Sequence, residues 1–209
     1  MKKIATVIAI LAGFCAAPAL AQDWYAGIAF SSTRGKVDES KINDDLTRNL
    51  GFFTATTSSD VRDSASRVFA GRTVLPWLDI EAWYAQLGDT KFKSTVTPPG
   101  TLDMTITSTA YGLGVVGNFS PVERLKIFGK VGVASVESKA NPVGTGFVEV
   151  GGSVKERHTS AAYGAGMTYQ LQPNIAVRVE YDVHKDAGGD KMGGKFDVQA
   201  ASIGVQFRF

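Results

Sequence analysis

Four charged residues that stand among alternating apolar residues are the first candidates for chemistry in this sequence. Glu81, Lys130, Arg178 and Glu180 are two acids and two bases, so their formal charges cancel. Groups of this kind either pair with one another in a closed interior or line a path for ions. Paired burial is the favoured interpretation, because a charge that leaves water without a partner is strongly disfavoured.

A second set of residues has the types used in nucleophilic catalysis. His158 and Ser160 fall on one side of an extended segment, His184 is the other histidine, and Glu156 is placed to orient a base. No hydrolase or acyltransferase motif surrounds them. We therefore expect them to supply polarity in a loop or an interior, and we expect the protein not to be an enzyme.

Two further patterns resemble ligand sites but are better explained as structure. Residues 112–117 match G-x-G-x-x-G, yet no helix follows and the run ends in a turn at Pro121, so a nucleotide site is not expected. We expect these glycines to leave room for the side chains of Lys130 and Arg178. An acidic group lacks the spacing of a calcium loop and is expected to be a solvated surface, so no metal or cofactor is predicted. Its members are Asp38, Glu39, Asp44 and Asp45.

The beginning of the chain has the pattern of a secretory signal. Two lysines precede an apolar run, and small residues stand at Ala19 and Ala21, the positions that a signal peptidase requires. We expect residues 1–21 to be cleaved as a signal peptide. Residues 22–209 are then expected to form one exported domain.

The composition of the exported domain excludes several classes of protein. Cys15, the only cysteine, lies in the signal, so no disulfide is expected. A lipoprotein anchored through Cys15 is disfavoured, because Phe14 stands where a lipobox has a small residue. Removing Lys2 and Lys3 takes the formal charge from +2 to zero, unlike the basic surface of a nucleic-acid binder. No later stretch approaches the ~20 apolar residues of a membrane-spanning helix.

Apolar residues at every second position predict eight strands along the exported domain. Three short turns, each containing a proline, separate some of them. These turns fall at 75–77, 120–124 and 171–174. Long polar connections separate the others, at about 32–64, 88–104, 136–157 and 184–195. Short turns at one end and long loops at the other are typical of outer-membrane β-barrels.

The four charged residues decide between a soluble sheet and a membrane barrel. Counted from the nearest short turn at ~3.3 Å per residue, all four lie about half-way across an apolar band of ~25 Å. They share the face opposite to apolar residues such as Ile80, Val131 and Val179. Lipid outside and a filled lumen inside explain this inverted pattern. We therefore predict an all-β, eight-stranded antiparallel up-and-down transmembrane β-barrel, with the four charges forming a plug.

Aromatic residues fit the two interfaces of such a barrel. Those expected in the outer girdle are Tyr84, Tyr111, Tyr163 and Tyr181, and those in the inner girdle are Trp24, Phe119, Tyr169, Phe207 and Phe209. The faces of the strand at about 65–75 stay open, because either Arg67 or Arg72 takes an unexpected side. We expect Arg72 to snorkel to the nearby interface.

Several short motifs follow one another in a familiar order. They are Phe-Ala-Gly at 69–71, Leu-Asp-Ile-Glu-Ala at 78–82, Tyr-Gly-Leu-Gly at 111–114, Ile-Phe-Gly-Lys-Val-Gly at 127–132, Pro-Asn-Ile-Ala-Val-Arg-Val-Glu-Tyr at 173–181 and Val-Gln-Phe-Arg-Phe at 205–209. Together they resemble the OmpA/OmpX-like outer-membrane β-barrel domain family, over residues 22–209. The resemblance implies insertion by the outer-membrane assembly machinery, which reads a C-terminal aromatic signal that Phe207 and Phe209 match.

The resemblance also implies roles for lumenal residues. In the OmpA branch a glutamate and an arginine take part in a lumenal gate, and Glu81 and Arg178 match them. The family's lumenal lysine and second glutamate are replaced by Val116 and Thr168, so an identical switch is not expected. The peptidoglycan-binding domain of full-length OmpA proteins has no counterpart in this sequence. Cell-wall tethering is therefore not expected.

The resulting expectation is a structural and surface-interaction role in the bacterial cell outer membrane, as an adhesin or surface antigen. Expected partners are outer-membrane lipid and lipopolysaccharide, and a host or cell-surface ligand at the long loops. Within the first loop, residues 40–50 have helical spacing and predict a short amphipathic helix over the barrel mouth. One alternative is a narrow pore for small solutes or ions, which planar-bilayer conductance would reveal. Another is a lipid A-modifying enzyme, which mass spectrometry of lipid A would reveal.

Overall fold

A computed structural model describes most of the chain, as nine strands and one helix. It covers residues 23–36, 39–48, 54–60, 62–97, 99–146, 148, 151–185 and 197–209. In chain order the elements are β1 (Trp24–Lys36), α2 (Glu39–Arg48), β2 (Thr54–Asp60), β3 (Arg62–Leu75), β4 (Leu78–Thr97), β5 (Gly100–Val122), β6 (Leu125–Gly146), β7 (Val154–Gln172), β8 (Ile175–His184) and β9 (Asp197–Arg208). The expected signal peptide lies outside the described residues. No helix within the described ranges is long and apolar enough to cross a membrane.

Eight of the strands close into a ring in which every neighbour is antiparallel. The ring runs β1, β3, β4, β5, β6, β7, β8, β9 and returns to β1, where Ile28 lies opposite Val205. The ninth strand, β2, pairs with the part of β4 that extends beyond its pairing with β3. β2 and β3 therefore lie one after the other along the same edge of β4. The predicted eight-stranded antiparallel barrel is confirmed.

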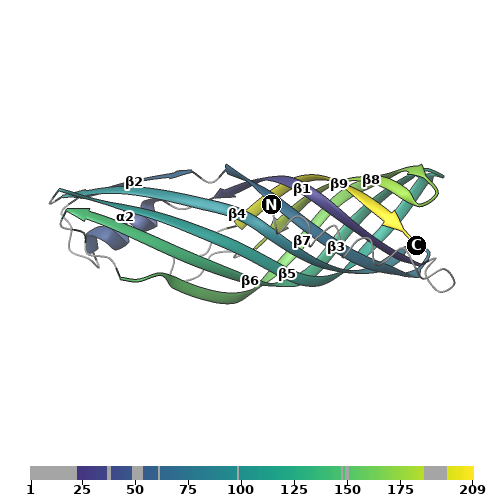
Figure 1. The fold of residues 1–209 in the computed structure, drawn as a ribbon, viewed down its shortest axis with the longest axis horizontal. Helices are drawn as coiled ribbons and strands as arrows, with labels where there is room; N and C mark the ends of the chain where they lie inside the picture. The colour runs from purple at the N-terminus through teal and green to yellow at the C-terminus, as the bar shows by residue number, and fades with distance from the viewer. Residues whose placement is uncertain are drawn as a thin grey trace, which may run out of the picture.

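The two ends of the barrel differ, as the sequence predicts. At one end the strands are joined by two-residue turns at 76–77, 123–124 and 173–174. At the other end β4, β5 and β6 continue well past the remaining strands (Figure 1). The predicted connections at 88–104 and 136–157 are therefore wrong in extent, since both are largely strand. Threonine and lysine gave these stretches a polar composition, but they alternate with buried residues, and threonine favours extended backbone.

These continuations form what we call the extended sheet, residues 54–60, 91–97, 100–106 and 140–146. One of its faces has a core of its own, with Ile106 only 1% exposed and Val96 3% exposed. Buried hydroxyls on that face pair across strands, as Thr57 and Ser94 do at 2.8 Å. The helix predicted at 40–50 is observed as α2, which packs against β2. Leu50 lies outside the described residues.

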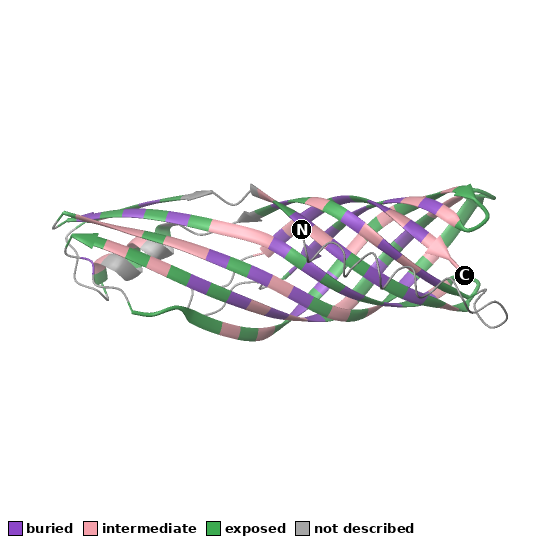
Figure 2. Ribbon diagram, viewed as in Figure 1, coloured by how far each residue is buried: buried purple, intermediate pink, exposed green. Residues whose placement is uncertain are grey.

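The barrel wall alternates between a buried and an exposed face along almost every strand (Figure 2). Large apolar residues face outward, including Ile80, Val131 and Ile203, which are 50–60% exposed. Seven of the residues expected in the girdles are also exposed on the outside. They are Trp24, Tyr84, Tyr111, Phe119, Tyr163, Tyr169 and Tyr181. An exposed apolar surface of this extent requires a hydrocarbon surrounding.

Inside the wall, each of four aromatic side chains lies over a glycine directly opposite on the next strand. The pairs are Tyr25 over Gly71, Phe69 over Gly27, Trp83 over Gly112 and Phe128 over Gly166. A Cβ atom added at any of these glycines would lie 2.3–2.6 Å from the aromatic ring. The expectation that residues 112–117 leave room for Lys130 and Arg178 is thus corrected. The space at Gly112 and Gly114 is filled by Trp83.

This packing predicts that Gly112→Ala destabilises the barrel by about 1–3 kcal/mol, the usual cost of overpacking. The added methyl group would meet the Trp83 ring at 2.5 Å and the Val133 carbonyl oxygen at 2.6 Å. Gly129→Ala is the matched control, because a Cβ there meets nothing within 4 Å. Urea unfolding of both variants in detergent measures the difference, and equal stabilities would contradict the role given to Gly112.

Candidate functional site

Six ionised side chains converge in the middle of the lumen. The structure places all four of the sequence-predicted charges there and adds two more. None of the six is more than 5% exposed. They are Arg67 on β3, Glu81 on β4, Lys130 on β6, and Arg178, Glu180 and Asp182 on β8. We call these six residues the lumenal network.

Glu81 is fully buried and is held by three neighbours. Arg178 approaches it with both terminal nitrogens, Nη1 at 2.6 Å from Oε2 and Nη2 at 3.4 Å from Oε1. The Tyr25 hydroxyl donates to Oε2 at 3.1 Å. Lys130 Nζ lies 3.7 Å from Oε1. Both carboxylate oxygens are therefore engaged, as a buried carboxylate requires.

Glu180 and Asp182 occupy successive inward positions on β8 and share two cations. Glu180 accepts from Arg67 Nη1 at 3.0 Å and from Arg178 Nε at 2.8 Å, and it also pairs with Lys130. Asp182 pairs with Arg67 at 2.5 Å and with Lys130 at 2.9 Å. Glu180 thus contacts all three cations of the lumenal network.

The lumenal network is electrically balanced, with three cations and three carboxylates. Balance matters here because charges taken out of water cost several kcal/mol each unless they are paired and hydrogen-bonded. The contacts are charge-assisted and shared among several partners, so each group supports the others. Loss of any one member would leave the buried network with an excess charge.

Aromatic rings fix the cations of the lumenal network from the sides. The Arg178 guanidinium lies between the Phe69 and Phe128 rings, 4.6 Å and 4.3 Å from their centres. Lys130 Nζ lies 4.9 Å from the centre of the Trp83 ring. Cation–π contacts of this kind gain strength where water is excluded. Three rings thus contact two of the three cations of the lumenal network.

Sequence reasoning missed three members of this site. Arg67 faces the lumen, while Arg72 lies outside over the Trp24 ring at 5.7 Å, near the short-turn end. This resolves the faces that the sequence left open on that strand, and Arg72 is placed as expected. Asp182 and Tyr25 also occupy alternate positions that point into the barrel. The period-two alternation of each strand was therefore the signal that could have found them.

The departures from the family pattern have a structural explanation. Val116, which replaces the family's lumenal lysine, lies directly opposite Lys130 on the next strand. Lys130 thus reaches Glu81 from the strand next to Val116. Thr168, which replaces the second glutamate, lies opposite Arg178, and Glu180 on β8 supplies a carboxylate nearby.

The residues considered for nucleophilic catalysis do not form a catalytic pair. The Ser160 hydroxyl donates to the backbone carbonyl of Lys185. Both ring nitrogens of His158 and Nδ1 of His184 have no hydrogen-bond partner among the described residues.

The other patterns considered as ligand sites are also placed. Residues 112–117 lie within β5, and a turn and β6 follow them, not a helix. Glu39, Asp44 and Asp45 lie on α2, and Asp38 falls outside the described residues. In the described part of the chain no three His, Cys, Asp or Glu side chains are grouped to hold a metal ion.

Arg178→Ala is predicted to lower the free energy of unfolding by about 3–5 kcal/mol, because it removes the cation nearest to Glu81 and leaves the buried network with one excess negative charge. Arg72→Ala is the matched control, since Arg72 lies on the outer surface. We expect that control to change stability by less than about 1 kcal/mol. Thermal melting in detergent measures both, and an unchanged melting temperature for Arg178→Ala would rule out a buried network.

Comparison with known proteins agrees with this architecture. The family described as Outer membrane protein beta-barrel domain matches residues 7–209. Outer membrane protein A of Salmonella typhi is 29% identical over 218 residues, and that of Shigella flexneri is 28% identical. Both alignments cover 100% of this chain but 56% of the relative, so the chain spans little more than half of their length.

Solved structures share the fold. Ail, the attachment invasion locus protein of Yersinia pestis, aligns with a TM-score of 0.54 at 16% identity, over 91% of this chain and 100% of its own. OprG from Pseudomonas aeruginosa aligns with a TM-score of 0.54 at 13% identity, over 90% and 96%. The chain thus belongs to the outer membrane protein beta-barrel domain family, and it is a β-barrel of the Gram-negative outer membrane.

Proposed function

We propose that the protein is a non-catalytic, plugged barrel that presents the extended sheet at the cell surface for adhesion. The observation that carries this proposal is the core of the extended sheet, which lies beyond the membrane-spanning part of the wall. A barrel that served only to span the membrane would not need strands of this length. Long, ordered extracellular structure on a rigid scaffold is typical of binding surfaces.

The outer surface near the base of the extended sheet carries basic residues suited to an acidic partner. Lys91, Lys93 and Lys139 are exposed there. Next to them, Lys155 and Arg157 donate to Glu137 at 2.8 Å and 2.7 Å, and these bonds hold the pKa of Glu137 below its usual range.

One structural neighbour gives this surface a precedent. Ail of Yersinia pestis was solved in complex with the heparin analogue sucrose octasulfate, and it shares the fold with a TM-score of 0.52 at 17% identity over 90% of this chain. For this protein we propose only that the ligand belongs to a cell surface. Outer-membrane lipopolysaccharide and the assembly machinery that reads Phe207 and Phe209 are further proposed partners.

Shortening the β4–β5 hairpin tests the adhesive role. Thr90 lies opposite Ile106, so residues 91–105 can be replaced by an Asn-Gly turn that keeps the barrel register. Expressed in a non-adherent bacterium, the native chain is expected to increase attachment to host cells or to heparin-coated surfaces, and the shortened chain is expected to lose this gain. Surface labelling of intact cells controls for display of each chain. Gel migration of boiled and unboiled samples controls for folding, because a closed barrel migrates differently before heat unfolds it. Equal attachment by both chains would refute the proposal.

A plugged lumen makes a separate prediction about conductance. The lumenal network and the rings around it fill the middle of the barrel. Planar bilayers containing the folded chain are therefore expected to show no stable single-channel current. Arg72→Ala should behave like the native chain, because it leaves the lumen unchanged. Regular single-channel steps from the native chain would favour the pore alternative over the plug.

A further inference from the structure

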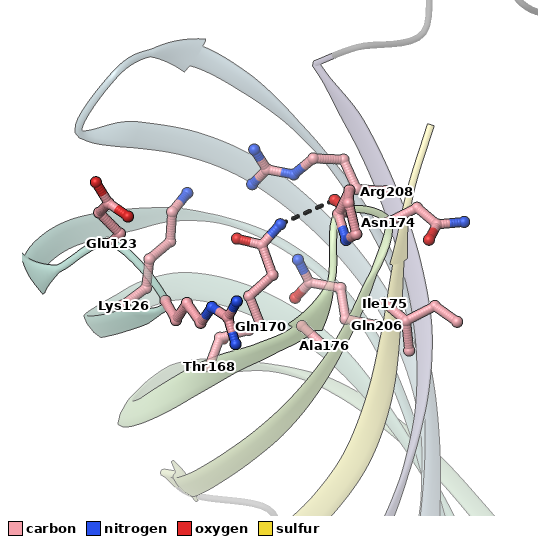
Figure 3. A pocket seen from close by; sticks show the side chains of 11 residues that line it. Glu123, Lys126, Thr168, Gln170, Asn174, Ile175, Ala176, Gln206 and Arg208 are labelled. Carbon is pink, nitrogen blue, oxygen red and sulfur yellow. Dashed lines mark hydrogen bonds between the residues drawn. The ribbon is translucent and has the colours of Figure 1, made fainter.

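A small polar pocket lies at the short-turn end of the lumen, which is the periplasmic end. Its volume is about 60 Å³, and its lining comes from β6, β7, β8, β9 and the adjoining turns. Figure 3 shows the side chains of Lys126, Gln170 and Arg208 reaching toward the same space from different strands. These residues play no part in the lumenal network, so the proposed function does not use this pocket.

Positive charge dominates the lining. Lys126, Arg208 and Arg124 all line the pocket, and Glu123 is the one carboxylate among the lining residues. Lys126 and Arg208 lie close enough to repel each other. None of the ion pairs between described residues involves these three cations. Asp79, which is buried on β4, lies close enough to Lys126 to attract it. Three cations therefore meet two carboxylates, Asp79 and Glu123, in contrast to the balanced lumenal network.

The size of the pocket limits what can fill it. A cavity needs about 10–15 Å³ to hold one water molecule, so this pocket of about 60 Å³ has room for roughly four water-sized groups. This is the size of a tetrahedral oxyanion. Ammonium and guanidinium groups are the donors that proteins use for phosphate. The side-chain amide of Gln206, only 8% exposed, adds a polar group to the same wall.

We propose that this pocket binds a phosphate-type oxyanion on the periplasmic side of the membrane. Lys126 and Arg208 supply the opposing charges, and Arg124 closes the site from the turn. The oxyanion comes either from free inorganic phosphate or from the headgroup of an inner-leaflet phospholipid. In both cases it neutralises the excess positive charge below the plug.

Titration with inorganic phosphate tests the site. The native chain, folded in a neutral detergent, is expected to broaden the ³¹P resonance of phosphate saturably and to melt at a higher temperature in phosphate than in chloride of equal ionic strength. Lys126→Gln is expected to weaken the affinity tenfold or more. Arg72→Gln is the matched control, because Arg72 lies on the outer surface near the same end of the barrel and does not line the pocket, and this variant should bind like the native chain. If Lys126→Gln fails to fold, Arg124→Gln in the turn replaces it with the same expectation.

Reconstitution distinguishes the two sources of phosphate. If the headgroup is the ligand, vesicles of either phosphatidylglycerol or phosphatidylcholine will block the binding of free phosphate, and vesicles of a phosphate-free galactolipid will not. If free phosphate is the ligand, it will bind in vesicles of each of these lipids. Either outcome supports the site. No saturable binding by the native chain, or equal binding by the native chain and Lys126→Gln, would overturn it.

Discussion

The structure depends on the pairing of six buried charges in the middle of the lumen. Each carboxylate of the lumenal network must find its cations within the barrel, since the outer face of the surrounding wall meets hydrocarbon. This requirement couples strand register to stability. A slip of one residue on β8 would move Arg178 and Glu180 to the lipid side and bring Val179 inside. The balance of three cations and three carboxylates therefore specifies the register of the wall as well as filling its centre.

The pairs of aromatic residues and glycines connect that balance to the backbone. Phe69 lies over Gly27 and Phe128 over Gly166, and these same two rings enclose the Arg178 guanidinium. A glycine on one strand thus decides how flat a ring lies on the next, and the ring decides where the cation sits. The glycines are needed here for close approach, not for an unusual backbone conformation.

Much of this arrangement was predictable from the sequence, for a simple reason. Alternation with period two assigns each residue to a face, and this was enough to place Glu81, Lys130, Arg178 and Glu180 in the lumen. Alternation does not say which residues meet across the lumen, so the links from Arg67 to Glu180 and from Tyr25 to Glu81 needed the closed ring. The extended sheet was underestimated because its outer face is polar, as at Lys91, Lys93 and Thr95. Composition there resembles a loop, while the buried row that includes Val96 and Ile106 marks a strand.

The connectivity of the lumenal network also bears on what the barrel can do. A gate built from one acid and one base can open when a single pair exchanges partners. Here Glu180 contacts Arg67, Lys130 and Arg178 at once, so moving one cation away leaves the carboxylate held by the other two. Opening a path would require several buried pairs to break together, at several kcal/mol each. A lumen of this kind favours a permanent plug over a gate.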